Sequence, residues 1–180
     1  MTQSRAINKR LQGQRGIVVI WFALLLPVLF GFMALAIDLA RLYQTKVELQ
    51  NAADAAALAG ALAVSSPSPG TFSWSNVVPE AQKMAQSNYA NGVLIQHVTI
   101  DNGYWDASNP AAGLHSSYTA GDLPAVKVTI EVSATKNGGP LNFFFAPFLG
   151  IASKDIQATA TAAAKLPVAP ATATTSILVQ

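Results

Sequence analysis

The sequence predicts an α+β protein with a long N-terminal membrane-spanning helix that continues into an outer domain with an antiparallel sheet. Residues 17–37 form a run of 21 residues without a charged side chain. The helical pattern continues through residues 38–63, whereas residues 125–135 alternate apolar and polar side chains with the period of two that is typical of strands. These observations predict four parts in chain order: a basic cytoplasmic segment (1–16), a transmembrane helix (17–37), an extracytoplasmic α+β domain (38–165) and a flexible Ala/Thr/Pro-rich tail (166–180).

Residues 17–37 have the length and composition of a single membrane crossing. The hydrocarbon core of a bilayer is about 30 Å thick, and a helix that rises about 1.5 Å per residue spans it with roughly 20 apolar residues. We therefore expect a membrane anchor that begins at Ile17, ends at Ile37 and contains Trp21 and Pro27. Pro27 should kink the helix inside the bilayer, where neighbouring groups can satisfy the carbonyl that it leaves free.

Charges on the two sides of this run predict its orientation. Four basic residues and no acidic residue precede it: Arg5, Lys9, Arg10 and Arg15. Basic residues stay on the cytoplasmic side during insertion, so residues 1–16 should be cytoplasmic and residues 38–180 should lie outside. The sequence pI of about 9.0 reflects this basic segment, because the rest of the chain carries seven basic and nine acidic residues. The pI therefore does not indicate nucleic-acid binding.

A cleaved signal peptide is the alternative interpretation of this N-terminus. The tripeptide Ala34-Leu35-Ala36 has the small-x-small form that signal peptidase prefers, and a basic segment precedes it. Signal-peptide cores usually have about 7–15 apolar residues, however, and this run is longer and leads into a continuing helix. We therefore expect the segment to be retained as an anchor, with cleavage at Ala36 as the alternative.

Residues 38–63 are predicted to continue the same helix outside the membrane. Alanine is the best helix former, and no Pro or Gly interrupts the stretch before Gly60. Lys46 and Gln50 interrupt an otherwise apolar face. Four small residues on this helix would allow a second backbone to approach closely: Ala53, Ala56, Ala57 and Gly60. They predict either a contact with another subunit or packing against the chain's own domain.

Two segments between this helix and the predicted sheet lack strand periodicity. Residues 65–75 are rich in turn-forming residues and predict a loop. A second helix should run from about Val77 to Ala90, because the Asn91-Gly92 pair that follows is typical of a helix end.

The rest of the outer domain shows strand character. Residues 125–135 and 155–165 alternate apolar and polar side chains, and the apolar ones in the second segment are small enough to let a helix lie close. Residues 93–101 are rich in β-branched residues. We expect these three segments to form an antiparallel sheet. Residues 102–124 should be mostly loop, with three aromatic packing anchors: Tyr104, Trp105 and Tyr118.

The segment LNFFFAPFLG (141–150) concentrates phenylalanine. Four of them fall within six positions: Phe143, Phe144, Phe145 and Phe148. Full burial of one such side chain stabilises a fold by about 1.5–3 kcal/mol, so exposing all four to water would be costly. We expect them to plug the core between helix and sheet. The alternative is an exposed patch for a partner or the membrane surface, because large apolar patches mark interaction sites.

No residue pattern in the sequence indicates catalysis. The chain has no cysteine, and its two histidines, His97 and His115, have no partners at metal-ligand spacing. It also lacks a Gly-rich phosphate loop and a G-x-S-x-G nucleophile elbow. We therefore expect no enzyme activity, no cofactor and no metal. Asp38 is interpreted as the boundary residue of the membrane segment.

Several stretches of the chain together carry a family resemblance. Gln14-Arg15-Gly16, the apolar run with Pro27 and the sequence AIDLARLYQTKVELQNAADAAALAGA (36–61) resemble the N-terminal region of TadG-like proteins of the tight-adherence (Flp) pilus-assembly system. The V-x-V-x-I-x-V strand, the FFFAPFLGI segment and the ATATA strand are similar to the wider TadE/TadG-like group. The resemblance implies a bacterial inner-membrane protein with a pilin-like, periplasmic outer domain. Its implied partners are the lipid bilayer and other Tad pilus-assembly or pilin-like proteins.

Two differences from related proteins refine this implication. Type IV prepilins typically carry a Gly at the processing site and a Glu at the fifth residue after it; if Gly16 is that glycine, the fifth residue is Trp21. Larger TadG-like proteins are similar to chains that also carry a C-terminal von Willebrand-type domain, which binds metal. We expect no such domain here. The sequence therefore predicts a non-catalytic subunit that assists Flp pilus assembly, with a minor pilin-like component as the finer form. The alternative is a membrane-tethered extracytoplasmic binding module unrelated to pili.

Overall fold

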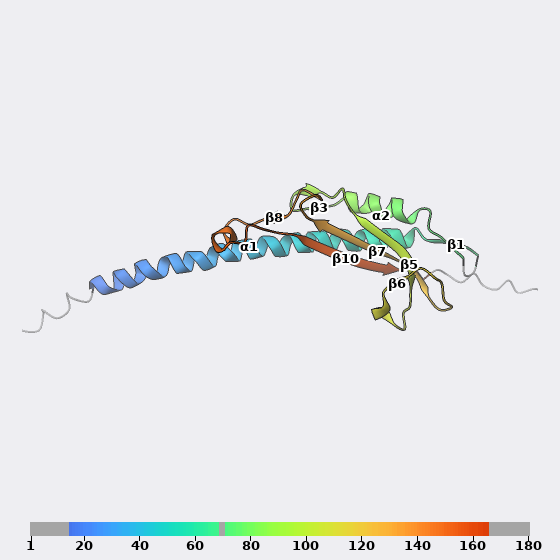
Figure 1. Ribbon diagram of the computed structural model, residues 1–180, viewed down its shortest axis with the longest axis horizontal. Coiled ribbons are helices and arrows are strands. Elements are labelled where there is room, and N and C mark those ends of the chain that lie inside the picture. The colour runs from blue at the N-terminus through green and yellow to red at the C-terminus, as the bar shows by residue number, and fades with distance from the viewer. Residues whose placement is uncertain (1–14, 69–70, 166–180) are drawn as a thin grey trace, which may run out of the picture. The chain divides into compact units, whose positions relative to one another are not determined.

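The computed structural model describes residues 15–68 and 71–165 and has the predicted α+β class, with a long N-terminal helix and an antiparallel sheet (Figure 1). The predicted tail (166–180) and residues 1–14 of the predicted basic segment lie outside the described residues. The chain divides into two compact units. The first unit is the described part of Met1–Tyr43 with Asn142–Ser153, and the second is that of Gln44–Leu141 with Lys154–Gln180.

The first helix, α1 (Arg15–Leu62), is continuous through 48 residues, which confirms the predicted continuation beyond the apolar run. Pro27 lies inside it. The helix begins in the first unit and ends in the second. Its alanine-rich stretch, from about residue 49 onwards, therefore belongs to the unit that contains the sheet.

The second unit is organised around a four-stranded antiparallel sheet with the strand order β10-β7-β5-β6 (Figure 1). Its strands are β5 (Thr99–Trp105), β6 (Leu114–His115), β7 (Leu123–Val132) and β10 (Ile156–Ala163). The register aligns Thr129 of β7 with Thr99 of β5 on one side and with Thr159 of β10 on the other. The strands predicted at 125–135 and 155–165 are thereby confirmed.

One face of this sheet carries the core of the second unit. Alternate residues of β7 are fully buried on that face: Val126, Val128, Ile130 and Val132. The helix α2 (Val77–Gln86) contributes small buried residues to the same core. A Cβ added at Gly60 of α1 would lie 3.0 Å from Val126 Cγ1 and 3.1 Å from Ala81 Cβ. Small residues are therefore required where α1, α2 and β7 meet.

Lys46 and Gln50, which interrupt the apolar face of α1, have a structural role in this unit. The Lys46 ammonium group donates to the carbonyl oxygen of Gln157, and Gln50 Nε2 donates to the carbonyl oxygen of Thr159 at 3.2 Å. Both acceptors lie on β10, an edge strand of the sheet. Unpaired carbonyls on an edge invite pairing with another chain, so these two side chains also protect the edge.

The structure corrects the helix predicted at 77–90 and the strand predicted at 93–101. Helix α2 ends at Gln86. The following β3 (Tyr89–Ala90) and β4 (Val93–Leu94) form a hairpin around Asn91-Gly92, whose φ angles are 51° and 75°. Both central residues of such a two-residue turn need positive φ, and Asn-Gly supplies them at low cost. The strand of the main sheet begins later, at Thr99.

The two predicted loops also contain short elements. The segment predicted as a loop at 65–75 holds a small hairpin of β1 (Ser65–Ser68) and β2 (Thr71–Ser73). Within 102–124, β5 continues to Trp105, and the 3-10 turn η1 (Pro110–Ala112) precedes β6. Between β7 and β10, β8 (Leu141–Asn142) pairs with β9 (Ser153–Lys154), and the 3-10 turn η2 (Ala146–Leu149) lies between them.

Candidate functional site

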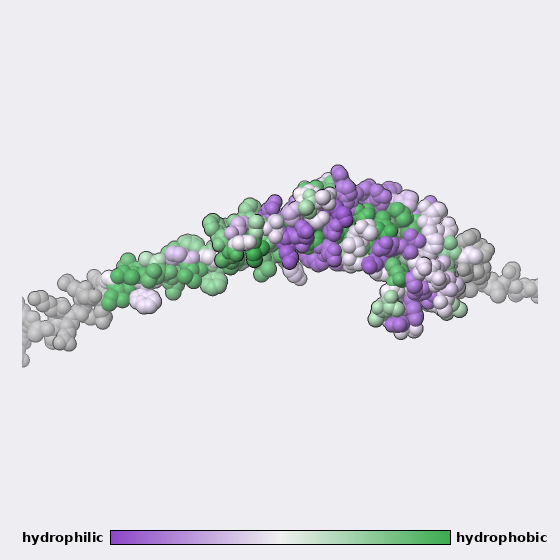
Figure 2. All heavy atoms as spheres, in the orientation of Figure 1, coloured by the Kyte–Doolittle hydropathy of each residue, from purple (hydrophilic) through white to green (hydrophobic). Residues whose placement is uncertain are grey.

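The apolar stretch of α1 in the first unit is exposed. Its most apolar window has no buried share, and the helix is long and apolar enough to cross a membrane. The predicted anchor residues Ile17, Trp21 and Ile37 are 57%, 68% and 45% exposed. Figure 2 shows that most of the surface of this stretch of α1 is hydrophobic. A surface of this extent is typical of a region that another apolar medium or partner covers.

Asp38 directly follows this stretch and holds the segment around η2. Asp38 is only 3% exposed, and its carboxylate accepts hydrogen bonds from three consecutive backbone N–H groups. Oδ1 accepts from Phe144 at 2.8 Å, and Oδ2 accepts from Phe145 at 2.8 Å and from Ala146 at 2.7 Å. The first N–H groups of a helical turn have no partner inside it, and a charged acceptor binds them more strongly than a neutral one.

Arg41 lies one turn further along α1 and contacts the same segment. Its Nη1 donates to the carbonyl oxygen of Asn142 at 2.9 Å. Its guanidinium carbon lies 4.3 Å from the centre of the Phe144 ring, within the range of a cation–π contact. Two charged residues of one helix thus hold a segment that follows them by 101 to 108 positions.

The phenylalanines of this segment do not plug a core, so that prediction is wrong. Phe144, Phe145 and Phe148 are 63%, 38% and 88% exposed, and Phe143 is half-buried. The buried residue of η2 is Ala146, at 7%. The reason is that the segment is held to Asp38 by its backbone, which leaves its bulky side chains on the outside. The structure instead agrees with the alternative prediction, an exposed apolar patch.

These exposed side chains form one wall of an apolar groove within the first unit. The groove has a volume of about 510 Å³. Phe145, Phe148 and Leu149 line one side, and α1 residues between Val28 and Leu35 line the other. Apolar surface therefore extends from α1 onto the η2 segment (Figure 2).

The small residues predicted as a partner contact lie in the second unit. Ala53, Ala56 and Ala57 are at most 1% exposed, and Gly60 is buried against Val126 and Ala81. In the structure these residues therefore pack within the chain's own domain, which was the alternative prediction. A partner could reach this face only if the domain opened, so a role in a partner contact stays a prediction.

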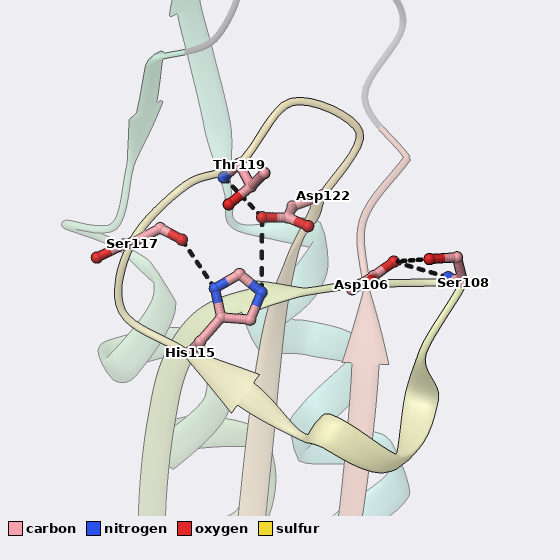
Figure 3. Close-up of polar contacts among 6 residues, drawn as sticks. All are labelled: Asp106, Ser108, His115, Ser117, Thr119 and Asp122. Carbon is pink, nitrogen blue, oxygen red and sulfur yellow. Dashed lines mark hydrogen bonds and ion pairs between the residues drawn. The ribbon is translucent and has the colours of Figure 1, made fainter.

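His115 and Asp122 tie together a loop of the second unit (Figure 3). His115 Nδ1 donates to the carbonyl oxygen of Ser117 at 2.8 Å, because a carbonyl can only accept. His115 Nε2 lies 3.5 Å from Asp122 Oδ2, which also accepts from the Thr119 N–H at 2.7 Å. One ring nitrogen is therefore hydrogen-bonded within the loop and the other faces Asp122, so His115 is a hydrogen-bonded residue of this loop, as its isolation in the sequence indicates.

Asp106 closes a neighbouring turn in the same figure. Its Oδ1 accepts from the Ser108 hydroxyl at 2.6 Å and from the Ser108 N–H at 2.8 Å (Figure 3). These two hydrogen bonds, the hydroxyl one first, hold the pKa of Asp106 below its ordinary value. The contact is local, since donor and acceptor are two residues apart.

An aromatic cluster accompanies these loops. Tyr104 lies 5.3 Å from Tyr118, 5.7 Å from Phe72 and 5.7 Å from Trp74, measured between ring centres. Offset and edge-to-face pairs at these distances are favourable. The packing role predicted for Tyr104 and Tyr118 is confirmed. Trp105 instead lines a groove of about 380 Å³ with Leu114 and Lys127.

Metal ligands do not gather in the part of the chain that the structure describes. Within residues 15–68 and 71–165, no three or more His, Asp or Glu side chains are grouped so that they could hold a metal ion.

The role of Asp38 was not apparent from sequence, because its partners are backbone amides, which every residue except proline possesses. Its position as the first charge after the apolar run was the only available signal.

Comparison with known proteins gives two matches. Residues 16–63 match a family model described as putative Flp pilus-assembly TadE/G-like, and residues 40–162 match one described as putative Tad-like Flp pilus-assembly. The second match covers 123 of the 180 residues, including the sheet and the η2 segment. No curated protein and no solved structure matches the chain significantly.

Proposed function

Because this chain belongs to the Tad-like Flp pilus-assembly family, we propose that it is a single-pass subunit of the bacterial inner membrane that assists pilus assembly without catalysis. Family membership supports a place among the other Tad proteins, which would be its partners. The second unit would lie on the periplasmic side. The subunit would act by presenting surfaces rather than by chemistry.

The exposed apolar stretch 17–37 carries this proposal. Burial of one large apolar side chain is worth about 1.5–3 kcal/mol, so a stretch of this length would not remain in water. A bilayer accepts it at a length of roughly 20 residues. The four basic residues before the stretch favour a cytoplasmic N-terminus.

The finer proposal is a minor pilin-like component. An apolar helix that leaves the bilayer can pack against equivalent helices of other subunits, because both surroundings are apolar. The residue at the fifth position after Gly16 is Trp21 rather than an acid. A tryptophan cannot form an ion pair with a neighbouring N-terminus, which favours an assisting role over that of the main fibre subunit.

Gene deletion with complementation tests the proposal. Deletion should greatly reduce surface pili and adhesion, and the full chain should restore both. A chain with residues 1–37 replaced by a cleavable secretion signal should reach the periplasm and fail to restore them. Normal pili in the deletion strain would contradict the proposal and favour a tethered binding module unrelated to pili.

Immunodetection in sheared, purified pili tests the finer proposal. A minor pilin-like component should be found in the fibres in small amounts relative to the main pilin. Detection in the membrane fraction alone, with pili absent from the deletion strain, would support assembly assistance and contradict incorporation.

A further inference from the structure

We propose that residues 143–151 form a second, shallow contact with the outer leaflet of the membrane, positioned by Asp38. The occupant of this surface would be the acyl-chain boundary of the phospholipid bilayer. The inference rests on the proposed membrane anchor and adds a contact that a single-pass anchor does not by itself require.

The segment presents large apolar side chains and no charge. Its sequence is FFFAPFLGI. Phe148, Leu149 and Ile151 are 88%, 65% and 53% exposed, and Phe145 lines the groove together with Phe148 and Leu149. Side chains of this size stabilise a segment in the membrane interface because their apolar area leaves water.

The location of the segment along α1 matches the depth of an interfacial contact. Gly31 and Leu35, which line the groove opposite Phe148, lie seven and three residues before Asp38. These separations correspond to about 10 Å and about 4–5 Å along the helix axis. Interfacial segments bury their apolar side chains about 5–10 Å into the boundary between headgroups and acyl chains. Asp38 and Arg41 would then lie at the headgroup level.

The backbone of the segment is suited to an apolar medium, where an unpaired N–H group is costly. Asp38 accepts the N–H groups of residues 144–146. Pro147 has no N–H group to satisfy. Four further donors pair with nearby carbonyls: Phe143 with Ala152, Phe148 with Phe145, Gly150 with Pro147, and Ile151 with Ala146.

Continuity with the anchor favours a bilayer over a second copy of the chain as the occupant. The groove is shared between the η2 segment and the apolar stretch of α1. If α1 crosses the membrane, lipid surrounds that stretch and reaches the groove without any further assembly step. A second copy would have to displace this lipid first.

Fluorescence quenching in lipid nanodiscs tests the inference on the full chain, which has no native cysteine. An environment-sensitive nitrobenzoxadiazole label is attached to Phe148→Cys. The reference positions are Phe32→Cys in the proposed anchor and Tyr89→Cys on the second unit, which are 68% and 61% exposed. Doxyl-labelled phospholipids report contact with acyl chains, and aqueous iodide reports contact with water. Discs with one chain each exclude a second copy.

The label at position 148 should behave like that at 32. Doxyl lipids should quench it, and iodide quenching should be several-fold weaker than at 89. Quenching at 148 like that at 89, with position 32 still in contact with lipid, would overturn this inference and leave the anchor intact. Failure at 32 as well would overturn the anchor. Shielding at 148 only in discs with two chains would identify a second copy as the occupant and also overturn the inference.

The variant Asp38→Asn tests the positioning role. It turns one accepting oxygen into an NH2 group, which cannot accept a hydrogen bond, and leaves the other oxygen uncharged, so doxyl quenching at 148 should fall while that at 32 is unchanged. Asp54→Asn is the matched control on the same helix, since Asp54 accepts from Gln50 Nε2 at 2.9 Å, and it should alter neither label. Unchanged quenching at 148 in Asp38→Asn would contradict the role assigned to Asp38.

Discussion

The two stretches of α1 differ in burial, and the stretch with the larger apolar side chains is the more exposed one. The stretch rich in Leu, Phe and Ile, residues 17–37, is exposed, whereas the stretch rich in alanine, residues 49–61, contains most of the buried residues of the helix. The difference lies in the surroundings that each stretch needs. A sheet approaches α1 closely enough that a Cβ at Gly60 would lie 3.0 Å from Val126, so only small side chains fit. A fluid bilayer adapts to large side chains and favours them.

The largest expected effect comes from removing a buried side chain of the second unit. Ile130 is fully buried, whereas Ile151 is 53% exposed. Ile130→Ala should lower the free energy of unfolding by about 2–5 kcal/mol, because it loses burial and leaves a cavity. Ile151→Ala, the same chemical change outside the second unit, should alter the free energy of unfolding of the second unit by less than about 0.5 kcal/mol. Denaturant unfolding of the full chain in nanodiscs measures both, and similar losses would refute the contrast.

A pair of glycines on α1 provides the next comparison. A side chain at Gly60 would meet Val126 and Ala81, whereas nothing lies within 4 Å of a Cβ at Gly31. Gly60→Leu should destabilise the second unit by about 1–3 kcal/mol through overpacking. Gly31→Leu should leave its unfolding unchanged. Equal stability of the two variants would show that α1 does not pack on the sheet as described.

A smaller, local effect is expected at Asp38. Asp38→Asn replaces one acceptor oxygen by an NH2 group, which cannot accept, and removes the charge from the other, so the free energy of local opening around residues 144–146 should fall by about 1 kcal/mol or more. Amide hydrogen exchange there should become roughly fivefold faster. Exchange in β7 should stay unchanged, because that strand belongs to the second unit. Faster exchange in β7 would indicate global destabilisation instead.

The smallest effect is expected at Asp106, whose partner is local. Its pKa lies below the ordinary value because the Ser108 hydroxyl and N–H bind the charged form. A lowered folded-state pKa stabilises the fold above the unfolded-state pKa, and this stabilisation is lost as the pH falls through the folded-state value. Ser108→Ala should raise the pKa of Asp106 toward its ordinary value in a carboxyl NMR titration. An unchanged pKa would show that the Ser108 hydroxyl does not bind the carboxylate.

Periodicity and apolar content predicted the long helix, β7 and β10 correctly, because these depend on the pattern of side chains along one element. The Asn91-Gly92 pair was misinterpreted, since the same residues can end a helix or form a hairpin turn, and the pairing of Ala90 with Val93 decides between them. The small residues of β10 correctly predicted that a helix approaches the sheet. The sequence showed Lys46 and Gln50 only as polar interruptions of an apolar helix face, and not as donors to the carbonyl groups at the edge of β10.

Contacts between a side chain and a distant backbone were beyond sequence reasoning. Asn137 is an example: its side chain accepts from the N–H groups of Gln96 and His97 and donates to the carbonyl oxygens of His97 and Glu131. Asp38 is another, and its binding of the η2 backbone reversed the predicted burial of the phenylalanines. Backbone groups are the same in every residue, so no residue pattern identifies them as partners.

Cysteine accessibility along α1 tests most directly the claim that a bilayer covers its first stretch. Leu25 and Leu62 are both exposed in the chain, at 60% and 77%. In intact inner membranes, a water-soluble maleimide should modify Leu62→Cys rapidly from the periplasmic side and leave Leu25→Cys unmodified, because in the proposed topology only Leu25 is surrounded by lipid. Equal modification rates at the two positions would contradict the account.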